Sequence, residues 1–254
     1  MPRHIAILSA MPEEIGLTLK FLSNVVESEY GDLKIFSGEW HEENSNKPSL
    51  FVSTSWSGWG KVSSARAATR ILANTYKGSK VDTLFFTGVA GSANKDVNQW
   101  DIVIPSEVLQ HDMDARPLFK QFVIPALNKE KLEASQNLGD WAFNIFNNAL
   151  REGKLNIFGK LHNGLIATGD KFVSDKFFIK KLNDQLDGLM AVEMEGASVA
   201  QVAYQENVPW LIIRVISDSA DEDAFDSFEE FIKKYNNESW NIIKTLLEGF
   251  KTMP

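Results

Sequence analysis

Residues 210–218 read WLIIRVISD, an almost continuous apolar run that ends in a serine and an aspartate. A run of this kind predicts a buried strand, and Asp218 stands at its carboxyl end, where open α/β sheets place their ligands. Upstream of this run, a helix is predicted at 65–73 and a second apolar strand at 83–87. Strand, helix and strand alternate along the chain, which predicts a parallel sheet.

The other expected elements continue this alternation. They are a strand at 4–10, an amphipathic helix over 12–22, a hairpin over 25–40, strands at 49–55, 101–105, 107–109, 158–168 and 189–195, helices at 129–150, 197–204 and 227–251, and glycine-bounded turns at 57–61 and 88–92. No internal repeat, linker or low-complexity segment separates them. We therefore expect a single domain over residues 1–254.

The composition argues against several classes of protein. Apolar residues make up 44% and charged residues 24% of the 254 residues, as in ordinary globular proteins. A net charge of −8, with only isolated basic pairs at 180–181 and 233–234, argues against a nucleic acid as partner. The chain has no cysteine, and its four histidines stand singly without zinc-ligand spacing. No metal and no cofactor are expected.

The N-terminal apolar run is short and is followed at once by Glu13 and Glu14. It therefore reads as a buried strand and not as a signal peptide. Later apolar stretches, such as 210–213, are far below membrane-spanning length. We expect a cytoplasmic protein that has no membrane partner.

Carboxylates stand where several elements begin or end. Asp218 is placed to meet a ligand, although an N-cap is the commoner role at such a junction, and Asp221 could equally take it. Glu193 and Glu195 would point the same way if the strand continued to Glu195, so both could face one pocket. Otherwise Glu195 would only supply a favourable charge at the start of the next helix. Glu14, taken alone, reads as a surface acid on a helix.

Seven short motifs, taken together, resemble the 5′-methylthioadenosine/S-adenosylhomocysteine nucleosidases of the purine nucleoside phosphorylase superfamily. In chain order they are SAMPEE (9–14), SGWGK (57–61), TGVAG (87–91), HD (111–112), TGDKFV (168–173), VEME (192–195) and ISDSAD (216–221). The resemblance implies a three-layer α/β/α fold around a mixed, mostly parallel twisted sheet. It also implies a homodimeric hydrolase that cleaves the N-glycosidic bond of 5′-modified adenine nucleosides. The pathway stays open between methionine salvage, removal of inhibitory by-products and menaquinone synthesis.

The resemblance assigns roles to residues at the matching positions. It implies that Asp218 protonates adenine at N7 and that Glu14 activates the attacking water. The residues implied to hold the substrate are Glu195 and the backbone near Met194 at the ribose hydroxyls, Phe172 stacked on adenine, Val173 at its edge, Arg214 beside Glu14 and the water, Phe228 as a lid near the ribose, and Glu193, Trp59, Val89 and Ala90 elsewhere in the pocket. These residue types suit the reaction, because bond cleavage builds positive charge on the sugar and negative charge on the purine.

Three departures from the family pattern bear on the attacking water, the acceptor and the 5′ substituent of the substrate. Val89 stands where such nucleosidases often have a serine that positions water. Neither 9–11 nor 88–91 contains a basic residue of the kind that phosphorylases use for phosphate, so water is the expected acceptor. Arg116, in the segment DARPLF (114–119) that should border the 5′ substituent across a dimer interface, is either a surface residue or a recognition residue for an anionic group.

Several functions remain open at this stage. The 5′ substituent is not determined, and methylthioadenosine, S-adenosylhomocysteine and 5′-deoxyadenosine are all candidates. The alternative functions are a phosphate-dependent phosphorylase, a futalosine-type hydrolase and a non-catalytic nucleoside-binding protein.

Overall fold

One large sheet organises the chain. The computed structural model describes residues 2–43, 45, 47–221 and 223–254, and within these residues ten strands join in the order β11-β10-β8-β12-β7-β1-β4-β3-β2, with β9 paired to β8. The strands of this sheet are β1 (Arg3–Ser9), β2 (Ser23–Tyr30), β3 (Leu33–Trp40), β4 (Leu50–Trp56), β7 (Thr83–Ser92), β8 (Ile102–Gln110), β9 (Lys131–Glu133), β10 (Leu161–Thr168), β11 (Leu189–Glu193) and β12 (Trp210–Asp218). A small separate hairpin joins β5 (Thr75–Tyr76) to β6 (Ser79–Lys80).

Parallel pairing dominates the centre of the sheet. β1 lies parallel to β4 and β7, β7 to β12, and β10 to both β8 and β11. Antiparallel pairs attach β2, β3 and β9 and also join β12 to β8. The sheet curls so far that β11 also pairs with β7, Ala191 opposite Ser92 and Val192 opposite Gly91. The predicted mixed, mostly parallel sheet is confirmed, and its curl brings the ends of β7 and β11 together.

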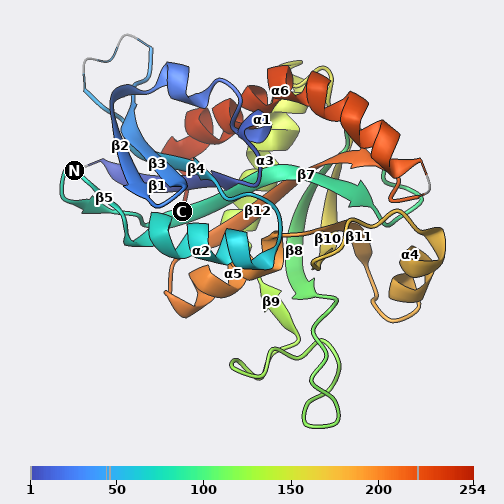
Figure 1. The fold of residues 1–254 in the computed structure, drawn as a ribbon. Helices are drawn as coiled ribbons and strands as arrows, with labels where there is room; N and C mark the ends of the chain where they lie inside the picture. The colour runs from blue at the N-terminus through green and yellow to red at the C-terminus, as the bar shows by residue number, and fades with distance from the viewer. Residues whose placement is uncertain (1, 44, 46, 222) are drawn as a thin grey trace.

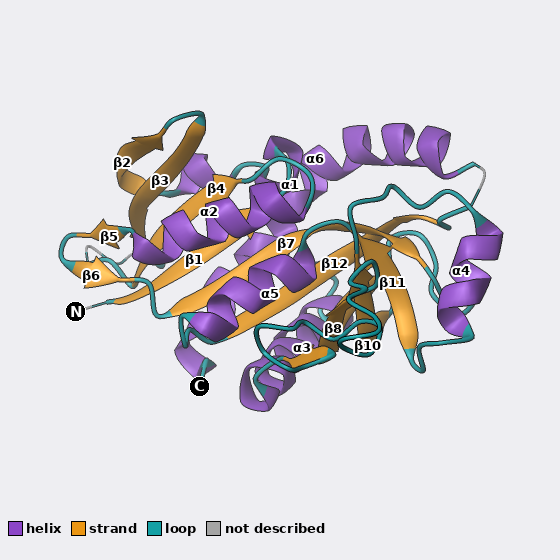
Figure 2. Ribbon diagram, turned by 60° about the horizontal axis from the view of Figure 1, so that its bottom comes forward, coloured by secondary structure: helices purple, strands orange, loops and turns teal. Residues whose placement is uncertain are grey.

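Helices cover both faces of this sheet. They are α1 (Pro12–Ile15), α2 (Lys61–Ala73), α3 (Gln136–Arg151), α4 (Lys176–Asn183), α5 (Gly196–Gln205) and α6 (Ala224–Gly249). Figure 1 and Figure 2 show α2 and α5 on one face and α3 and α6 on the other, so the three layers are confirmed.

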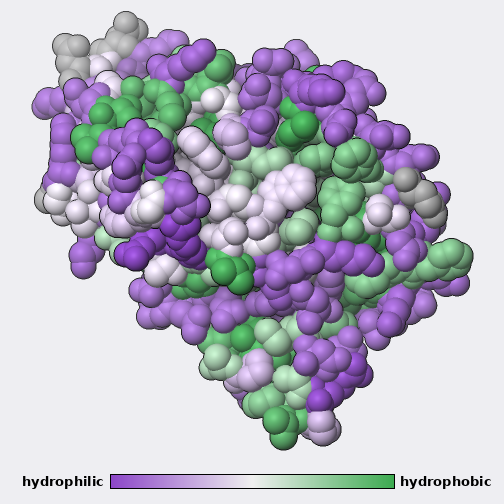
Figure 3. Space-filling model, viewed as in Figure 1, coloured by the Kyte–Doolittle hydropathy of each residue, from purple (hydrophilic) through white to green (hydrophobic). Residues whose placement is uncertain are grey.

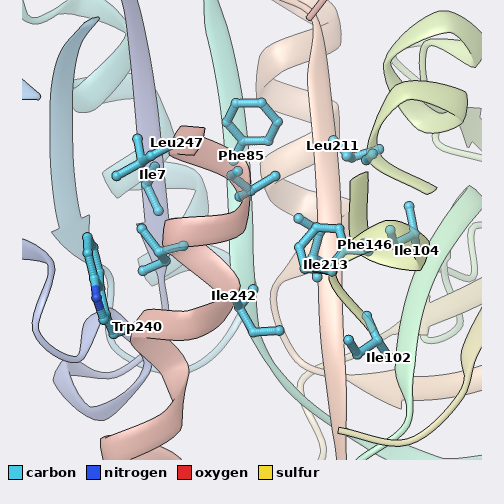
Figure 4. Packing of buried hydrophobic residues seen from close by; sticks show 14 of the residues in the cluster. Ile7, Phe85, Ile102, Ile104, Phe146, Leu211, Ile213, Trp240, Ile242 and Leu247 are labelled. Atoms are coloured by element: carbon cyan, nitrogen blue, oxygen red, sulfur yellow. The ribbon is translucent and has the colours of Figure 1, made fainter. Parts of the chain in front are cut away.

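Two large hydrophobic cores lie between the sheet and the helices α2, α3, α5 and α6, and a smaller third core joins α4 to β10 and β11. On β1, Ile5 and Ile7 face the core beneath α3 and α6, whereas Ala6 and Leu8 face the core beneath α2 and α5. Figure 4 shows the first of these cores, with Leu247 of α6 packed over the strands. Because both faces of the central strands are buried, these strands appear in the sequence as continuous apolar runs.

The amphipathic stretch after β1 forms only one helical turn, α1. Gly16 ends it with φ +55°, and a Cβ at Gly16 would collide with Ser239 Oγ of α6. A 3₁₀ turn follows at Thr18–Phe21. The helix predicted over 12–22 is therefore wrong beyond its first turn, because a contact with a remote segment decides where it stops.

Two further sequence predictions fail in the middle of the chain. The turn predicted at 88–92 is wrong, since β7 runs through to Ser92 and pairs with β12 along most of that length. The helix predicted over 129–150 starts too early, because Lys131–Glu133 adds β9 to the edge of β8 and α3 begins at Gln136. Pairing with strands remote in sequence determines the structure in both cases.

Three other elements, β8, α4 and β11, also differ from the prediction. Strand β11 ends at Glu193 and not at 195, and Glu195 takes the N-cap position of α5. Helix α4 was not predicted, although Asp175 caps it by accepting a hydrogen bond from Phe177 N at 2.8 Å. The strands predicted at 101–105 and 107–109 form one strand, β8.

Candidate active site

A cleft opens at the carboxyl ends of the parallel strands, and the empty space within and in front of it amounts to about 550 Å³, part of it open solvent. Its walls come from the ends of β1, β7, β11 and β12, from the turn after β4, from the segment after β10 and from the start of α6. The lining residues are Ala10, Met11, Glu14, Trp59, Val89, Ala90, Gly91, Lys171, Phe172, Val173, Val192, Glu193, Met194, Glu195, Ser217, Asp218 and Phe228. The fold thus brings together at this cleft every residue predicted for the site except Arg214, which lies buried behind it.

Glu14 is a buried carboxylate and not the surface acid that its local sequence suggests. Its Oε2 accepts hydrogen bonds from Ala10 N at 2.8 Å and from Met11 N at 2.9 Å, and its Oε1 accepts one from Val89 N at 2.9 Å. Burial raises the pKa of Glu14, while the charge of Arg214 and the three backbone amides oppose that rise. Since a carboxylate oxygen can accept two hydrogen bonds, Oε1 keeps one acceptor position while Oε2 is filled.

Glu193, at the wall of the cleft, forms a buried ion pair with Arg214, which lies behind it. Arg214 Nη2 donates to Glu193 Oε2, which also accepts from the backbone amides of Glu195 at 3.1 Å and Gly196 at 2.7 Å. Thr168 Oγ1 donates to the other oxygen, Glu193 Oε1. Glu193 therefore binds the N-terminus of α5 and fixes the backbone on which Glu195 stands.

Glu195 turns its side chain away from its own helix. Its Oε1 accepts a hydrogen bond from Gly60 N at 2.9 Å, and its Oε2 lies 3.8 Å from Arg214 Nη2. Burial, followed by the charge of Glu193, raises the pKa of Glu195 to about 8. The proposed helix-start position is correct, but the carboxylate does not cap α5. It lines the cleft together with Glu193, even though the strand stops short of Glu195.

Asp218 lines the cleft from the end of β12. Ser217 Oγ donates to its Oδ2 at 2.6 Å, and Ala220 N donates to its Oδ1 at 2.8 Å. Asp218 is not the N-cap of α6, a position that Asp223 takes, but its hydrogen bond from Ala220 N does cap the turn that follows β12. Burial raises the pKa of Asp218, so a proton can stay on this carboxyl group at a higher pH than on a free aspartate.

Three aromatic side chains lie together at the cleft. Phe228 of α6 meets Phe172 edge to face at 5.8 Å between centroids and meets Trp59 in the same way at 6.0 Å. Trp59 is 51% exposed, which places it at the mouth. These rings offer flat apolar surfaces to a planar base or to the sugar face of a ligand.

Some lining residues were missed by sequence reasoning. Ser217 hydrogen-bonds to Asp218, and its place directly before that acid was a signal that could have been used. Lys171 places its ammonium group over the ring of Phe178 at 4.2 Å from the ring centre, at the exposed edge of the cleft. Ala10, Met11, Gly91 and Val192 add backbone and apolar surface, and nothing in their residue types distinguishes them.

The segment between β8 and β9 projects from the body of the protein. Figure 1 draws it at the bottom of the view, and Figure 3 shows hydrophobic atoms on the same lobe. Arg116 pairs with the carboxylate of Asp114, both side chains are largely exposed, and neither lines the cleft. Leu118, also on this segment, is 86% exposed.

Two features are absent from the part of the chain that the structure describes. Within that part of the chain, no group of three or more histidine, aspartate or glutamate side chains is placed to hold a metal ion. None of the helices in the described ranges is long and apolar enough to cross a membrane.

Comparisons with known proteins agree with this geometry. A family model described as the phosphorylase superfamily matches residues 4–248. The 5′-methylthioadenosine/S-adenosylhomocysteine nucleosidase of Haemophilus ducreyi is 34% identical over 251 residues, which cover 98% of this chain and 100% of that protein.

Solved structures give the same result. A 5′-methylthioadenosine/S-adenosylhomocysteine nucleosidase from Neisseria meningitidis, in complex with methylthio-immucillin-A, superposes with a TM-score of 0.84 and 28% identity, covering 96% of this chain and 98% of that one. The futalosine hydrolase of Helicobacter pylori superposes with a TM-score of 0.82 and 32% identity, covering 97% of each chain.

Proposed function

The chain belongs to the phosphorylase superfamily and, within it, to the 5′-methylthioadenosine/S-adenosylhomocysteine nucleosidases, and we propose that it hydrolyses the N-glycosidic bond of 5′-modified adenine nucleosides. One observation carries this proposal. Glu14, Glu195 and Asp218 come from three separate elements, and all three line one cleft as buried carboxyl groups with raised pKa values. Such a set can supply an acid, a base and a negative charge to one reaction.

Asp218 is proposed as the general acid. Cleavage leaves negative charge on the purine, and a proton delivered to N7 turns the base into a neutral leaving group. Two donors, Ser217 Oγ and Ala220 N, orient the carboxyl group of Asp218. The raised pKa of Asp218 favours the protonated form that donation requires.

Glu195 is proposed to bind the ribose hydroxyls. Its Oε1 is held by Gly60 N, and Arg214 Nη2 lies 3.8 Å from its Oε2, which supports ionisation of the carboxylate against burial. A negative charge here is favourable when the sugar becomes cationic in the transition state. Met194 adds its backbone beside the same position.

Glu14 is proposed to activate the attacking water. The open acceptor position on its Oε1 lies next to Val89 N, at the wall of the cleft. Arg214 opposes the rise in the pKa of Glu14, which supports the ionised form that a general base needs. Val89 offers no hydroxyl, so the water would be held by Glu14 and by backbone groups.

Phe172, Val173 and Phe228 are proposed to bind the base and to cover the sugar. Phe172 and Phe228 present ring faces and edges to the cleft, and Val173 is buried beside them. Trp59 and Ala90 are proposed to contact the nucleoside from the turn after β4 and from the end of β7. Stacking of a purine on an aromatic ring is a common and favourable arrangement.

Electrostatics favours water over phosphate as the acceptor. Four carboxylates line the cleft, while the nearest buried cation, Arg214, is already paired with Glu193. Among the described lining residues Lys171 is the one cationic side chain, and its ammonium group lies over Phe178. A phosphate anion would therefore find no unpaired buried cation among the described lining residues, and it would be repelled by those acids that are ionised.

The relatives of the chain suggest two classes of 5′ substituent. Methylthioadenosine and S-adenosylhomocysteine are the first candidates because of the relatives that the chain resembles. A futalosine-type nucleoside is the second candidate, since a futalosine hydrolase superposes on 97% of the chain at 32% identity.

We also propose an oligomeric state, a domain organisation and a cellular location for the protein. A homodimer is supported by the exposed Leu118 and Phe119 on the projecting segment and by Val62, 81% exposed, in the first turn of α2. A single domain is supported because one sheet takes strands from residue 3 to residue 218. A cytoplasmic location and a role in methionine salvage complete the proposal and follow from the proposed substrates.

A base-release assay tests this function. The purified protein is incubated with methylthioadenosine, S-adenosylhomocysteine, 5′-deoxyadenosine and a futalosine-type nucleoside, with and without phosphate, and free base is measured. We expect release of base that does not depend on phosphate. The variant Asp218→Asn, purified in the same way, controls for contaminating nucleosidases. Release from none of the substrates would refute the proposal, and phosphate-dependent release would show a phosphorylase.

A further inference from the structure

The carboxylate of Glu195 depends on a turn that belongs to another part of the chain. Its hydrogen bond from Gly60 N comes from the turn between β4 and α2, in which Gly58 and Gly60 have φ values of +77° and +91°. Two glycines give this turn little intrinsic rigidity. Something outside the turn must therefore hold the Gly60 amide at 2.9 Å from Glu195 Oε1.

Lys61, Asp112 and Asp170 form a closed ring of hydrogen bonds, the charged circuit, beside this turn. Lys61 N donates to Asp170 Oδ1 at 2.8 Å, and Asp170 N donates to Asp112 Oδ2 at 3.0 Å. Lys61 Nζ completes the circuit by donating to Asp112 Oδ1 at 2.6 Å, and it also reaches Gln110 Oε1 at 3.2 Å. The circuit joins the start of α2 to the segments that follow β8 and β10.

The circuit also packs directly on Gly60. A Cβ at Gly60 would lie 3.0 Å from Asp170 Oδ1, so the carboxylate sits against the backbone whose amide binds Glu195. Lys61 is only 18% exposed and Asp112 32% exposed, so water screens this ion pair less than it screens a fully exposed pair. Lys61, Asp112 and Asp170 do not line the cleft themselves.

We propose that Lys61, Asp112 and Asp170 are positioning residues that hold the Gly60 amide against Glu195 and thereby orient the carboxylate that binds the ribose. This inference rests on the proposed function of Glu195. The three residues act through Gly60, because none of them lines the cleft in which the substrate would bind.

A second contact shows why loss of the circuit should not unfold the site. Ser64 Oγ and Ser198 Oγ lie 2.6 Å apart and tie the first turns of α2 and α5 together. Ser198 Oγ also donates to Glu195 O at 2.6 Å, and Ser64 Oγ donates to Gly60 O at 2.9 Å. These bonds hold the Gly60 carbonyl, and Ser64 N also donates to Gly60 O at 3.1 Å, so the start of α2 keeps its place when the charged circuit is lost. The circuit adds the contacts at Lys61 N and against the Gly60 backbone.

The pH profile provides a readout that is specific to positioning. The groups that face Glu195 are Glu193 on β11, Arg214 on β12, Glu14 on α1 and the Gly60 amide. The Gly60 hydrogen bond lowers the pKa of Glu195 against burial and the charge of Glu193. If the amide moves away, the pKa of Glu195 must rise, and the acidic limb of the rate profile must move to higher pH.

Two variants and a matched control test the proposal. Lys61→Met removes the ammonium group at nearly constant volume, and Asp112→Asn weakens both of its bonds. Lys131→Met breaks an ion pair to Glu107 on β8 of similar length, 2.8 Å, and similar exposure, 32% and 34%, away from the cleft. We expect kcat/KM to fall by roughly 10- to 100-fold in Lys61→Met and by less in Asp112→Asn, with no change in the control.

Further readouts separate positioning from folding and from the proposed function. Lys61→Arg should restore most of the activity, and melting temperatures should stay close to that of the wild type. Titration of the Glu195 carboxyl group by ¹³C NMR, assigned with Glu195→Gln, should show a higher pKa in Lys61→Met whether or not any nucleoside is cleaved. A wild-type protein that releases no base would refute the proposed function alone. A Lys61→Met variant with the wild-type pH profile and Glu195 titration would overturn the positioning role.

Discussion

The substitution Gly88→Ala tests the proposed catalytic site directly, because it adds a single methyl group between Glu14 and Arg214. A Cβ at this position would collide with Arg214 Nη1 and would lie 2.5 Å from Glu14 Oε1 and 2.9 Å from Glu14 Cδ. Gly88 has no left-handed φ, so alanine brings no backbone strain of its own. The whole effect must come from the displaced side chains.

The expected size of the effect follows from what these side chains hold. Glu14 Oε1 accepts from Val89 N, and Arg214 is paired with Glu193, so neither group can move without breaking a buried contact. Overpacking of a buried site costs about 1–3 kcal/mol of unfolding free energy. A displacement of Glu14 by about 1 Å should lower kcat by up to about 100-fold.

Urea denaturation and base release measure both effects. Gly139→Ala is the matched control, because Gly139 lies in α3 with no atom within 4 Å of its added Cβ. That control should gain roughly 0.5–1 kcal/mol of stability and keep its full turnover. If Gly88→Ala had the stability and turnover of the wild type, the close placement of Glu14 and Arg214 about Gly88 would be refuted.

Three other perturbations address the site. Asp218→Asn should lower the turnover with methylthioadenosine by about 10²- to 10⁴-fold, the range for a lost general acid, and a loss below tenfold at neutral pH would remove Asp218 from that role. Glu195→Gln should flatten the pH dependence of unfolding free energy measured in urea. The pKa of Glu195 is about 8 in the folded protein and 4.5 in the unfolded chain. The stability that Glu195 contributes is therefore complete below pH 4.5 and is lost as the pH rises to 8. The free energy of unfolding falls by at most about 1.4 kcal/mol per pH unit in this range. An unchanged slope would contradict the burial of an ionisable Glu195. Phe228→Ala should raise KM about tenfold, measured by initial rates, because the ring proposed to cover the sugar is removed and Phe172 and Trp59 lose their edge-to-face contacts with it. An unchanged KM would show that Phe228 does not cover the substrate.

The sequence predicts the layers of this fold well because its central strands are buried on both faces. The run 210–218 needs no partner to be identified as a strand, since every residue in it is buried in the folded protein. The failures occur where remote contacts decide the conformation. Ser239 of α6 limits α1 at Gly16, and β12 keeps residues 88–92 extended although their glycines favour a turn.

The candidate site was predictable as a set of residues but not as an arrangement. Motif resemblance found Glu14, Glu195 and Asp218, and the fold places all three at one cleft. The burial of Glu14 could not be predicted, because its backbone donors include Val89 N from a strand far along the chain. The hydrogen bonds between Lys61 and Asp112 could not be predicted either, because their motifs do not show which segments of the chain lie next to each other.

A crystal structure of Asp218→Asn with intact 5′-methylthioadenosine would test the central claim most directly. We predict adenine N7 within about 3 Å of the side chain at position 218, the ribose hydroxyls on Glu195, and a water molecule between Glu14 Oε1 and the anomeric carbon. The purine ring should lie against Phe172. A nucleoside bound in another orientation, with its base remote from position 218 or its ribose remote from Glu195, would contradict the roles proposed for these carboxylates.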